Sequence, residues 1–69
     1  MNTREALEKI PKKAQAKLKQ YRALYNNKRL PENDRALYRT QAAAYCMGLY
    51  HAGIITDLER RLLYTYTTV

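Results

Sequence analysis

Apolar residues recur along this chain at three- and four-residue spacing, the spacing that places side chains on one face of a helix. Between residues 10 and 25 the lysines and arginines fall mainly outside that face. The pattern predicts an amphipathic helix over about 11–26, with one stripe facing the core. That stripe consists of Ile10, Ala14, Leu18, Tyr21 and Tyr25.

Polar residues and prolines predict where the first helices begin and end. Asn2 is followed three residues later by Glu5, a spacing typical of a capped helix start. Pro11 then disfavours helical angles at Ile10. We expect a short opening helix, a break, and the longer helix over about 11–26.

The segment 31–52 is apolar on two sides. It begins at Pro31, which suits a first helical position. A helix of this kind is packed by neighbours on both sides, or by a neighbour and another copy of itself. We expect it to be the central helix, with small residues permitting close approach at Ala42, Ala43, Ala44 and Gly48. One stripe is Tyr38, Ala42, Tyr45, Leu49 and Ala52. The second, a candidate homodimer surface, is Ala36, Ala43, Met47 and Tyr50.

A helix stop and a helix start follow within a few residues. Gly53 suits the left-handed position after a helix, and Ile54 then falls where an apolar contact to Leu49 is expected. Thr56 and Glu59 have the spacing of a capping box, which starts the next helix. The sequence predicts a fixed corner between two helices.

The last helix should begin at Thr56 and turn Leu58, Leu62 and Tyr66 towards the core, with Leu63 on another side. The end of the chain, residues 64–69, is rich in β-branched and aromatic residues, which lowers helix propensity. We expect it to fray or to form a short extended tail.

These elements predict an all-α fold, a single domain over residues 1–69 with three to four helices around the long helix at about 31–52. The composition agrees, with two Gly, two Pro, no Trp or Phe and seven Tyr among 69 residues. A domain this short buries a limited core, so self-association would add stability. The single cysteine, and the lack of an apolar run long enough to span a membrane or of a signal pattern, predict a cytoplasmic protein that does not enter membranes.

The net charge of +7 is unevenly spread. Residues 1–30 carry nine lysines and arginines against two acids, whereas residues 31–69 hold four of each sign. This asymmetry favours an acidic macromolecule as partner, either nucleic acid or a nucleoprotein complex. The alternative is a solvated helix surface without a partner. The candidate binding residues are Lys12, Lys13, Lys17, Lys19, Arg22, Lys28 and Arg29.

Catalytic and metal sites find little support in the sequence. Cys46 and His51 are the only residues of their kinds, and one of each is too few to hold a metal. Cys46 is interpreted as a small buried core residue, and His51 as a partner for the helix C-terminal dipole. No glycine-rich phosphate loop is present. We therefore predict a protein that is not an enzyme and needs no cofactor.

Two other binding modes would use different residues. A helix-turn-helix reader of DNA would place the first turn of the last helix in the major groove, but that turn presents Asp57 and Glu59. Binding to a protein without nucleic acid would use tyrosines and arginines, which are enriched at interfaces. Arg60 and Arg61 are the contacts that the first mode would offer, and Tyr64 and Tyr66 in the tail suit the second; all four are candidate secondary contacts.

The segment 48–63, with its Ala-Gly-Ile-Ile-Thr-Asp-Leu-Glu core, resembles the helical hairpin of small bacterial modules of the SHOCT type. The whole chain is similar in style to accessory proteins of phages and mobile elements, among them anti-CRISPR proteins and regulators. This resemblance implies an inhibitor or regulator that acts on a host-defence nucleoprotein. The second expectation is an oligomerising scaffold or adaptor with no nucleic-acid role.

Overall fold

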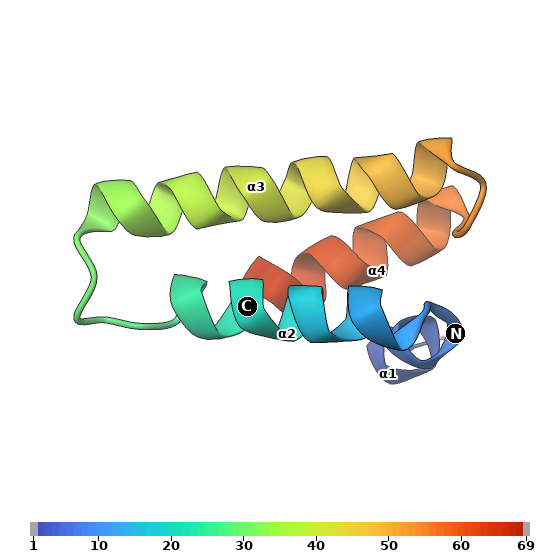
Figure 1. The fold of residues 1–69 in the computed structure, drawn as a ribbon, viewed down its shortest axis with the longest axis horizontal. Helices are drawn as coiled ribbons and strands as arrows, with labels where there is room; N and C mark the ends of the chain where they lie inside the picture. Colours follow the sequence, from blue (N-terminus) through green and yellow to red (C-terminus); the bar gives the residue numbers. More distant parts are fainter. Residues whose placement is uncertain (1, 69) are drawn as a thin grey trace.

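The computed structural model describes residues 2–68 and contains four α-helices in that range (Figure 1). They are α1 (Thr3–Lys9), α2 (Lys12–Tyr25), α3 (Glu32–His51) and α4 (Asp57–Thr68). The all-α prediction is confirmed, and the boundaries of α2 and α3 lie within a residue of those expected. Pro11 and Pro31 each precede a helix as its N-cap, with extended backbone angles.

The break between α1 and α2 follows from the residues at its edges. The Oδ1 of Asn2 accepts a hydrogen bond from the Glu5 N–H at 2.9 Å, which confirms the predicted cap of α1. Ile10 is extended, as a residue before proline should be. Gln15 donates from Nε2 to the Ile10 carbonyl at 2.9 Å and so holds the bend against α2.

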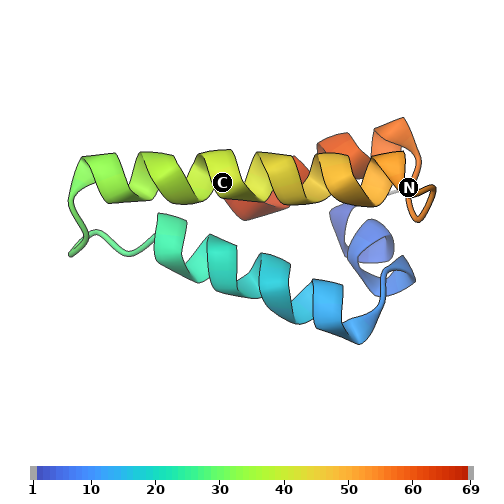
Figure 2. The same cartoon turned by 45° about the horizontal axis from the view of Figure 1, so that its top comes forward.

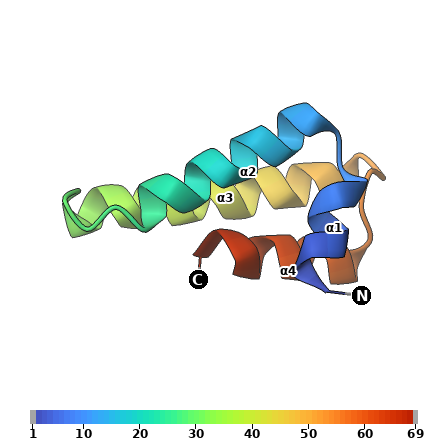
Figure 3. The same cartoon turned by 90° about the horizontal axis from the view of Figure 1, so that it is seen from below.

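The helices form a bundle measuring 33 × 20 × 19 Å. α2 and α3 make an antiparallel hairpin, and α4 packs against both of them and against α1 (Figures 1 and 2). α1 lies across the end of the bundle where α3 turns into α4 (Figure 3). α3 is the longest helix, while α4 is the one that packs against all three others.

The predicted stripe of α2 is the face that enters the core. Its first four members are buried, and Tyr25 at the end of the helix is half-buried. On α3 the buried residues include Cys46, as the sequence indicated, besides two members of the first predicted stripe. The buried apolar core is Ala6, Ile10, Ala14, Leu18, Tyr21, Ala42, Cys46, Leu49, Ile55 and Leu63.

The second apolar stripe of α3 has a neighbour within the chain. Ala36, Ala43 and Met47 are half-buried, and Tyr50 lies beneath the Arg60 guanidinium of α4, 6.0 Å from its ring centre. α3 therefore packs against α2 on one side and α4 on the other. The prediction for Gly48 is wrong, because a side chain there would meet no atom within 4 Å.

The corner between α3 and α4 has the predicted caps. Gly53 has a φ of 76°, and the N–H groups of Gly53 and Ile54 donate to the carbonyls of Tyr50 and Leu49, each at 3.0 Å. This is the Schellman arrangement, which satisfies carbonyls left free at a helix end. Ile54 itself remains 48% exposed.

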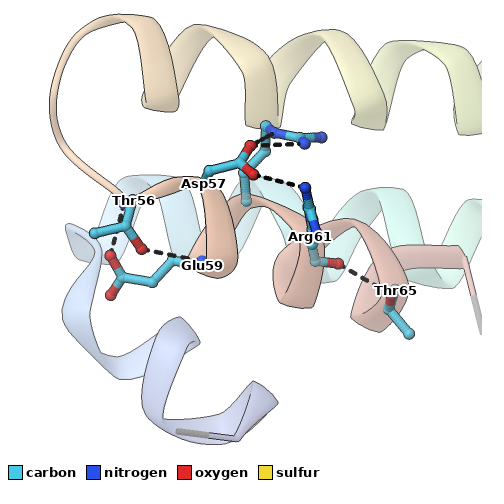
Figure 4. Close-up of polar contacts among 6 residues, drawn as sticks. Thr56, Asp57, Glu59, Arg61 and Thr65 are labelled. Atoms are coloured by element: carbon cyan, nitrogen blue, oxygen red, sulfur yellow. Dashed lines mark hydrogen bonds and ion pairs between the residues drawn. The ribbon is translucent and has the colours of Figure 1, made fainter.

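The capping box is also confirmed (Figure 4). The Thr56 N–H donates to the Glu59 carboxylate at 2.7 Å, and the Glu59 N–H donates to the Thr56 hydroxyl at 3.2 Å. Both donors would otherwise lack a partner at the start of α4. The box fixes where α4 begins.

The predicted face of α4 is wrong by one residue. Leu58 is 57% exposed, whereas Leu63 is fully buried, in one row with Glu59 and Thr67. The capping box turns Glu59 towards α1, where its carboxylate lies 3.6 Å from the Lys9 ammonium. Glu59, Leu63 and Thr67 follow one another at four-residue spacing, so they share the inward face of α4. Leu62 and Tyr66 are half-buried at the edge of this face.

The expected fraying or extended tail is also wrong for the described residues, since α4 continues to Thr68; Val69 lies outside them. Threonine hydroxyls in the last turns donate to carbonyls four residues earlier. Thr65 donates to Arg61 at 3.0 Å, Thr67 to Leu63 at 2.8 Å, and Thr68 to Tyr64 at 3.0 Å. Tertiary packing of Thr67 and of the tyrosines at 64 and 66 outweighs the low helix propensity.

Candidate polyanion-binding surface

The ion pairs of residues 2–68 all involve α1 and α4. Arg4 pairs with Glu8 at 3.2 Å on α1, and Lys9 of α1 pairs with Glu59 of α4. On α4, Asp57 binds two arginines in the following turn, as Figure 4 shows. Their guanidinium nitrogens lie 2.8 Å (Arg60) and 3.0 Å (Arg61) from its carboxylate.

These contacts stabilise the charged forms of the two carboxylates. A hydrogen bond from Arg60 lowers the pKa of Asp57, and the nearby positive charges of Arg60 and Arg61 act in the same direction. The backbone hydrogen bond from Thr56 lowers the pKa of Glu59. The arginines predicted as secondary contacts therefore lie beside a charged acid, which makes this end of α4 less attractive to an anion.

The cations of α2 lie elsewhere and are exposed. Lys12 and Lys19 share the outward face, since they are seven residues apart. Lys17 lies on the edge near α3 and Arg22 on the edge near α4. No carboxylate described in residues 2–68 lies within 4 Å of any of the predicted binding cations. Positive charge therefore surrounds the solvent-facing side of α2, through Lys12, Lys13, Lys17, Lys19 and Arg22.

The loop between α2 and α3 extends this surface. Asn27 holds the turn, because its side-chain oxygen accepts from the Arg29 N–H at 3.0 Å and its carbonyl from the Leu30 N–H at 3.1 Å. Lys28 and Arg29 are exposed at the tip. All seven predicted binding residues thus belong to α2 and the loop that follows it.

Tyrosine rings lie beneath two of the α2 cations. The Lys17 ammonium is 5.1 Å from the ring centre of Tyr21, which meets the Tyr45 ring edge-on at 6.1 Å. The Arg22 guanidinium is 4.6 Å from the ring centre of Tyr66. Tyr21 is buried, so it is a core residue and not a platform for stacked bases. Cation–π contact orients the cations along the two edges of α2.

Two further cations were missed in the sequence. Arg35 and Arg39 lie on the first turns of α3, where Arg35 donates from Nε to the Tyr25 carbonyl at 2.8 Å. The sequence concealed them because residues 31–69 carry equal numbers of cations and acids. Those acids include Asp57 and Glu59, which form ion pairs with residues other than Arg35 and Arg39. The spacing of the two arginines in the sequence, which places them on one face of the helix, is the signal that could have identified them. That face of α3 and Tyr25 of α2 line an open cavity of about 140 Å³. The lining residues on α3 are Glu32, Arg35, Ala36 and Arg39.

Reactive groups are few in the described chain. Cys46 is 1% exposed, and burial raises the pKa of its thiol to about 11. His51 is exposed in the last turn of α3, with its ring 5.5 Å from that of Tyr50. Residues 2–68 hold no cluster of three or more His, Cys, Asp or Glu side chains suited to a metal ion. None of the four helices has the length and apolar content required to cross a membrane.

Comparison with known proteins finds no match to the chain among protein-family models, curated proteins or solved structures.

Proposed function

We propose that this protein binds nucleic acid through the exposed cations of α2 and the α2–α3 loop, without catalysing a reaction. The observation that supports the proposal is the separation of charge. Among residues 2–68, the carboxylates held in ion pairs lie on α1 and α4. The binding residues are Lys12, Lys13, Lys17, Lys19, Arg22, Lys28 and Arg29, none of which has a carboxylate partner there.

Unpaired surface cations are effective ligands for phosphates. Each one that meets a phosphate releases a condensed counterion, and it does so here without first breaking an ion pair. The fourteen residues of α2 span about 21 Å. Duplex DNA carries a charge every ~1.7 Å of its axis, so a helix of this length can lie along several phosphates.

A helix-turn-helix arrangement is less well supported. The helix after the Gly53 corner begins with Asp57, and this acid holds both Arg60 and Arg61. Neither arginine could reach a base without leaving that carboxylate. Contact through α2, with little dependence on sequence, is the better account of the surface.

A host-defence nucleoprotein as the target, implied by the resemblance, stays a prediction. So does the scaffold that pairs two copies through Ala36, Ala43, Met47 and Tyr50. Sedimentation of the purified protein separates the scaffold from the monomer: if only monomer is found at high concentration, the scaffold is eliminated.

Fluorescence anisotropy with labelled duplex DNA, single-stranded DNA and RNA tests the proposal. We expect binding at low salt that weakens steeply as salt rises, because counterion release drives it. The charge-reversed variant Lys12→Glu/Lys13→Glu/Lys19→Glu should lose this binding. Lys12→Glu alone should weaken binding more than Arg4→Glu, a single reversal at an exposed site on α1, which serves as the control. Absence of binding to every nucleic acid, or binding that the triple variant retains, contradicts the proposal.

A further inference from the structure

The first turns of α3 project beyond α4. α3 has twenty residues and α4 has twelve, which correspond to lengths of about 30 Å and 18 Å. α4 runs back along α3 from the Gly53 corner and ends near its middle, so the α2–α3 hairpin extends past it (Figure 3). The face of α3 that packs against α4 is uncovered at its N-terminal end.

The cavity lies on this uncovered part. Its α3 residues recur at positions i, i+3, i+4 and i+7, which places them on one face. Tyr25 closes the α2 side, with its ring 5.6 Å from the Arg35 guanidinium. Because Arg35 also donates to the Tyr25 carbonyl, its position is fixed from two directions.

The cavity offers three kinds of chemical group. Arg35 and Arg39 present guanidinium donors, which suit a phosphate. Glu32 presents a carboxylate acceptor, and it forms no ion pair of 4 Å or less with the arginines beside it in residues 2–68. Tyr25 and the guanidinium on it provide a planar surface. A site for phosphate alone would gain nothing from Glu32, which repels an anion.

A nucleotide carries groups complementary to all three. Its phosphate accepts hydrogen bonds, its base is planar, and the edge of its base donates. Glu32 and Arg39 are seven residues apart, or about 10 Å along the helix axis, with Arg35 between them. A base edge at Glu32 and a phosphate at Arg39 would use both ends of the cavity.

We propose that this cavity binds one unpaired nucleotide of a single-stranded nucleic acid, with guanine preferred. This inference rests on the proposed function and specifies which nucleic acid is bound. Guanine has two adjacent donors on its Watson–Crick edge, N1–H and the N2 amino group, which match the two oxygens of the Glu32 carboxylate. In a duplex those donors are already paired, and the face of the base is covered by its neighbours.

The size of the cavity agrees with one nucleotide component. Sites for drug-sized molecules measure about 300–1,000 Å³, whereas this one measures about 140 Å³ and is open to solvent. It accommodates one ring system while the sugar and phosphate stay at its rim. The exposed cations Lys28 and Arg29 lie in the loop at the same end of the hairpin, where they could contact the phosphates of neighbouring nucleotides.

Binding of labelled 12-nucleotide dT strands, with and without one central dG, tests the proposal. The parent protein should bind the dG strand about tenfold or more tightly, as expected for a hydrogen bond to a charged group. Glu32→Gln should abolish this preference while leaving binding of the dT strand unchanged or tighter, because it removes a negative charge. Arg39→Ala should weaken binding of both strands by about threefold to tenfold.

Arg4→Ala is the control, because it also removes one exposed cation but lies on α1, away from the cavity. It should bind both strands as the parent does, and circular dichroism checks that all variants are folded. Equal binding of the two strands by the parent, or a dG preference that survives Glu32→Gln, overturns the nucleotide cavity and leaves the proposed function intact. If neither dT strand binds, the nucleotide cavity is overturned; if duplex DNA and RNA also fail to bind, the proposed function is contradicted as well.

Discussion

At the residue scale, the two glycines of the chain occupy sites with opposite requirements. Gly53 has a φ of 76°, which alanine adopts only at a cost of about 1–2 kcal/mol. Gly48 lies inside α3 with no atom within 4 Å of an added Cβ, so alanine there should gain about 0.5–1 kcal/mol.

Urea unfolding of Gly53→Ala and Gly48→Ala measures both effects. The first variant should be less stable than the parent and the second more stable. If Gly53→Ala were as stable as the parent or more stable, the assignment of Gly53 to the left-handed turn would be wrong. If Gly48→Ala were less stable, the open surroundings of Gly48 would be wrong.

The ionisation of Glu59, at the start of α4, makes the stability of the protein depend on pH. Its folded-state pKa lies below the ordinary value of 4.5, chiefly through the Thr56 N–H. The unfolded chain therefore binds the proton more readily. The stabilisation by this carboxylate is present above about pH 4.5 and is lost as pH falls through the folded-state value.

Glu59→Gln should accordingly be less stable than the parent at pH 7, and the difference should shrink towards pH 3. Some acid sensitivity should remain, because the pKa of Asp57 is also lowered. Urea unfolding across this pH range measures the difference. A constant gap between parent and variant from pH 7 to pH 3 would contradict the role of the carboxylate.

At the element scale, α4 distinguishes the structure from the sequence prediction most sharply. The sequence placed Leu58 in the core and Leu63 on another side, and the structure reverses them. Leu63→Ala should cost about 2–5 kcal/mol, the range for buried leucines, which approaches the whole stability of a domain this small. Leu58→Ala should change stability by no more than about 0.5 kcal/mol.

Thermal or urea unfolding of the two leucine variants decides between the two faces of α4. The same substitution on the same helix removes the effect of helix propensity from the comparison. A larger loss from Leu58→Ala would restore the face predicted from the sequence.

The elements that were predicted correctly had local signals. α2 has one apolar stripe between two prolines, and the α3–α4 corner has caps whose partners lie within five residues. The buried face of α4 includes Glu59, whose ion-pair partner Lys9 lies fifty residues away in the chain. Periodicity favoured the row of Leu58, Leu62 and Tyr66, since a glutamate at a buried position is recognised only once its partners are known.

At the scale of the whole molecule, the reactivity of the one thiol reports whether the core is packed. Cys46 of α3 is buried in the core that the helices share, and its raised pKa keeps it protonated at neutral pH. A chromogenic thiol reagent should react slowly with the native protein, at a rate that follows global unfolding, and quickly in denaturant. Rapid reaction in native buffer would contradict the packing of the core.

The candidate binding surface could be predicted only in part, because only some of its residues are close together in the sequence. The cations of residues 12–29 are close in sequence, so their excess of charge was visible without a structure. The contribution of Arg35 and Arg39 to the positive surface depends on which cations the acids pair with. Asp57 forms its ion pairs within α4, and Glu59 pairs with a lysine of α1. The cavity also depends on how the helices pack in space, because it lies where the α2–α3 hairpin extends past the end of α4.

The charge separation itself is tested most directly by the salt dependence of nucleic-acid binding. Each cation that contacts a phosphate contributes close to one unit to the slope of log affinity against log salt. Replacing Lys12, Lys13 and Lys19 by glutamine should reduce that slope by about two to three units, while Arg4→Gln should leave it unchanged. A slope that is the same in the parent and in the triple variant would contradict binding through α2.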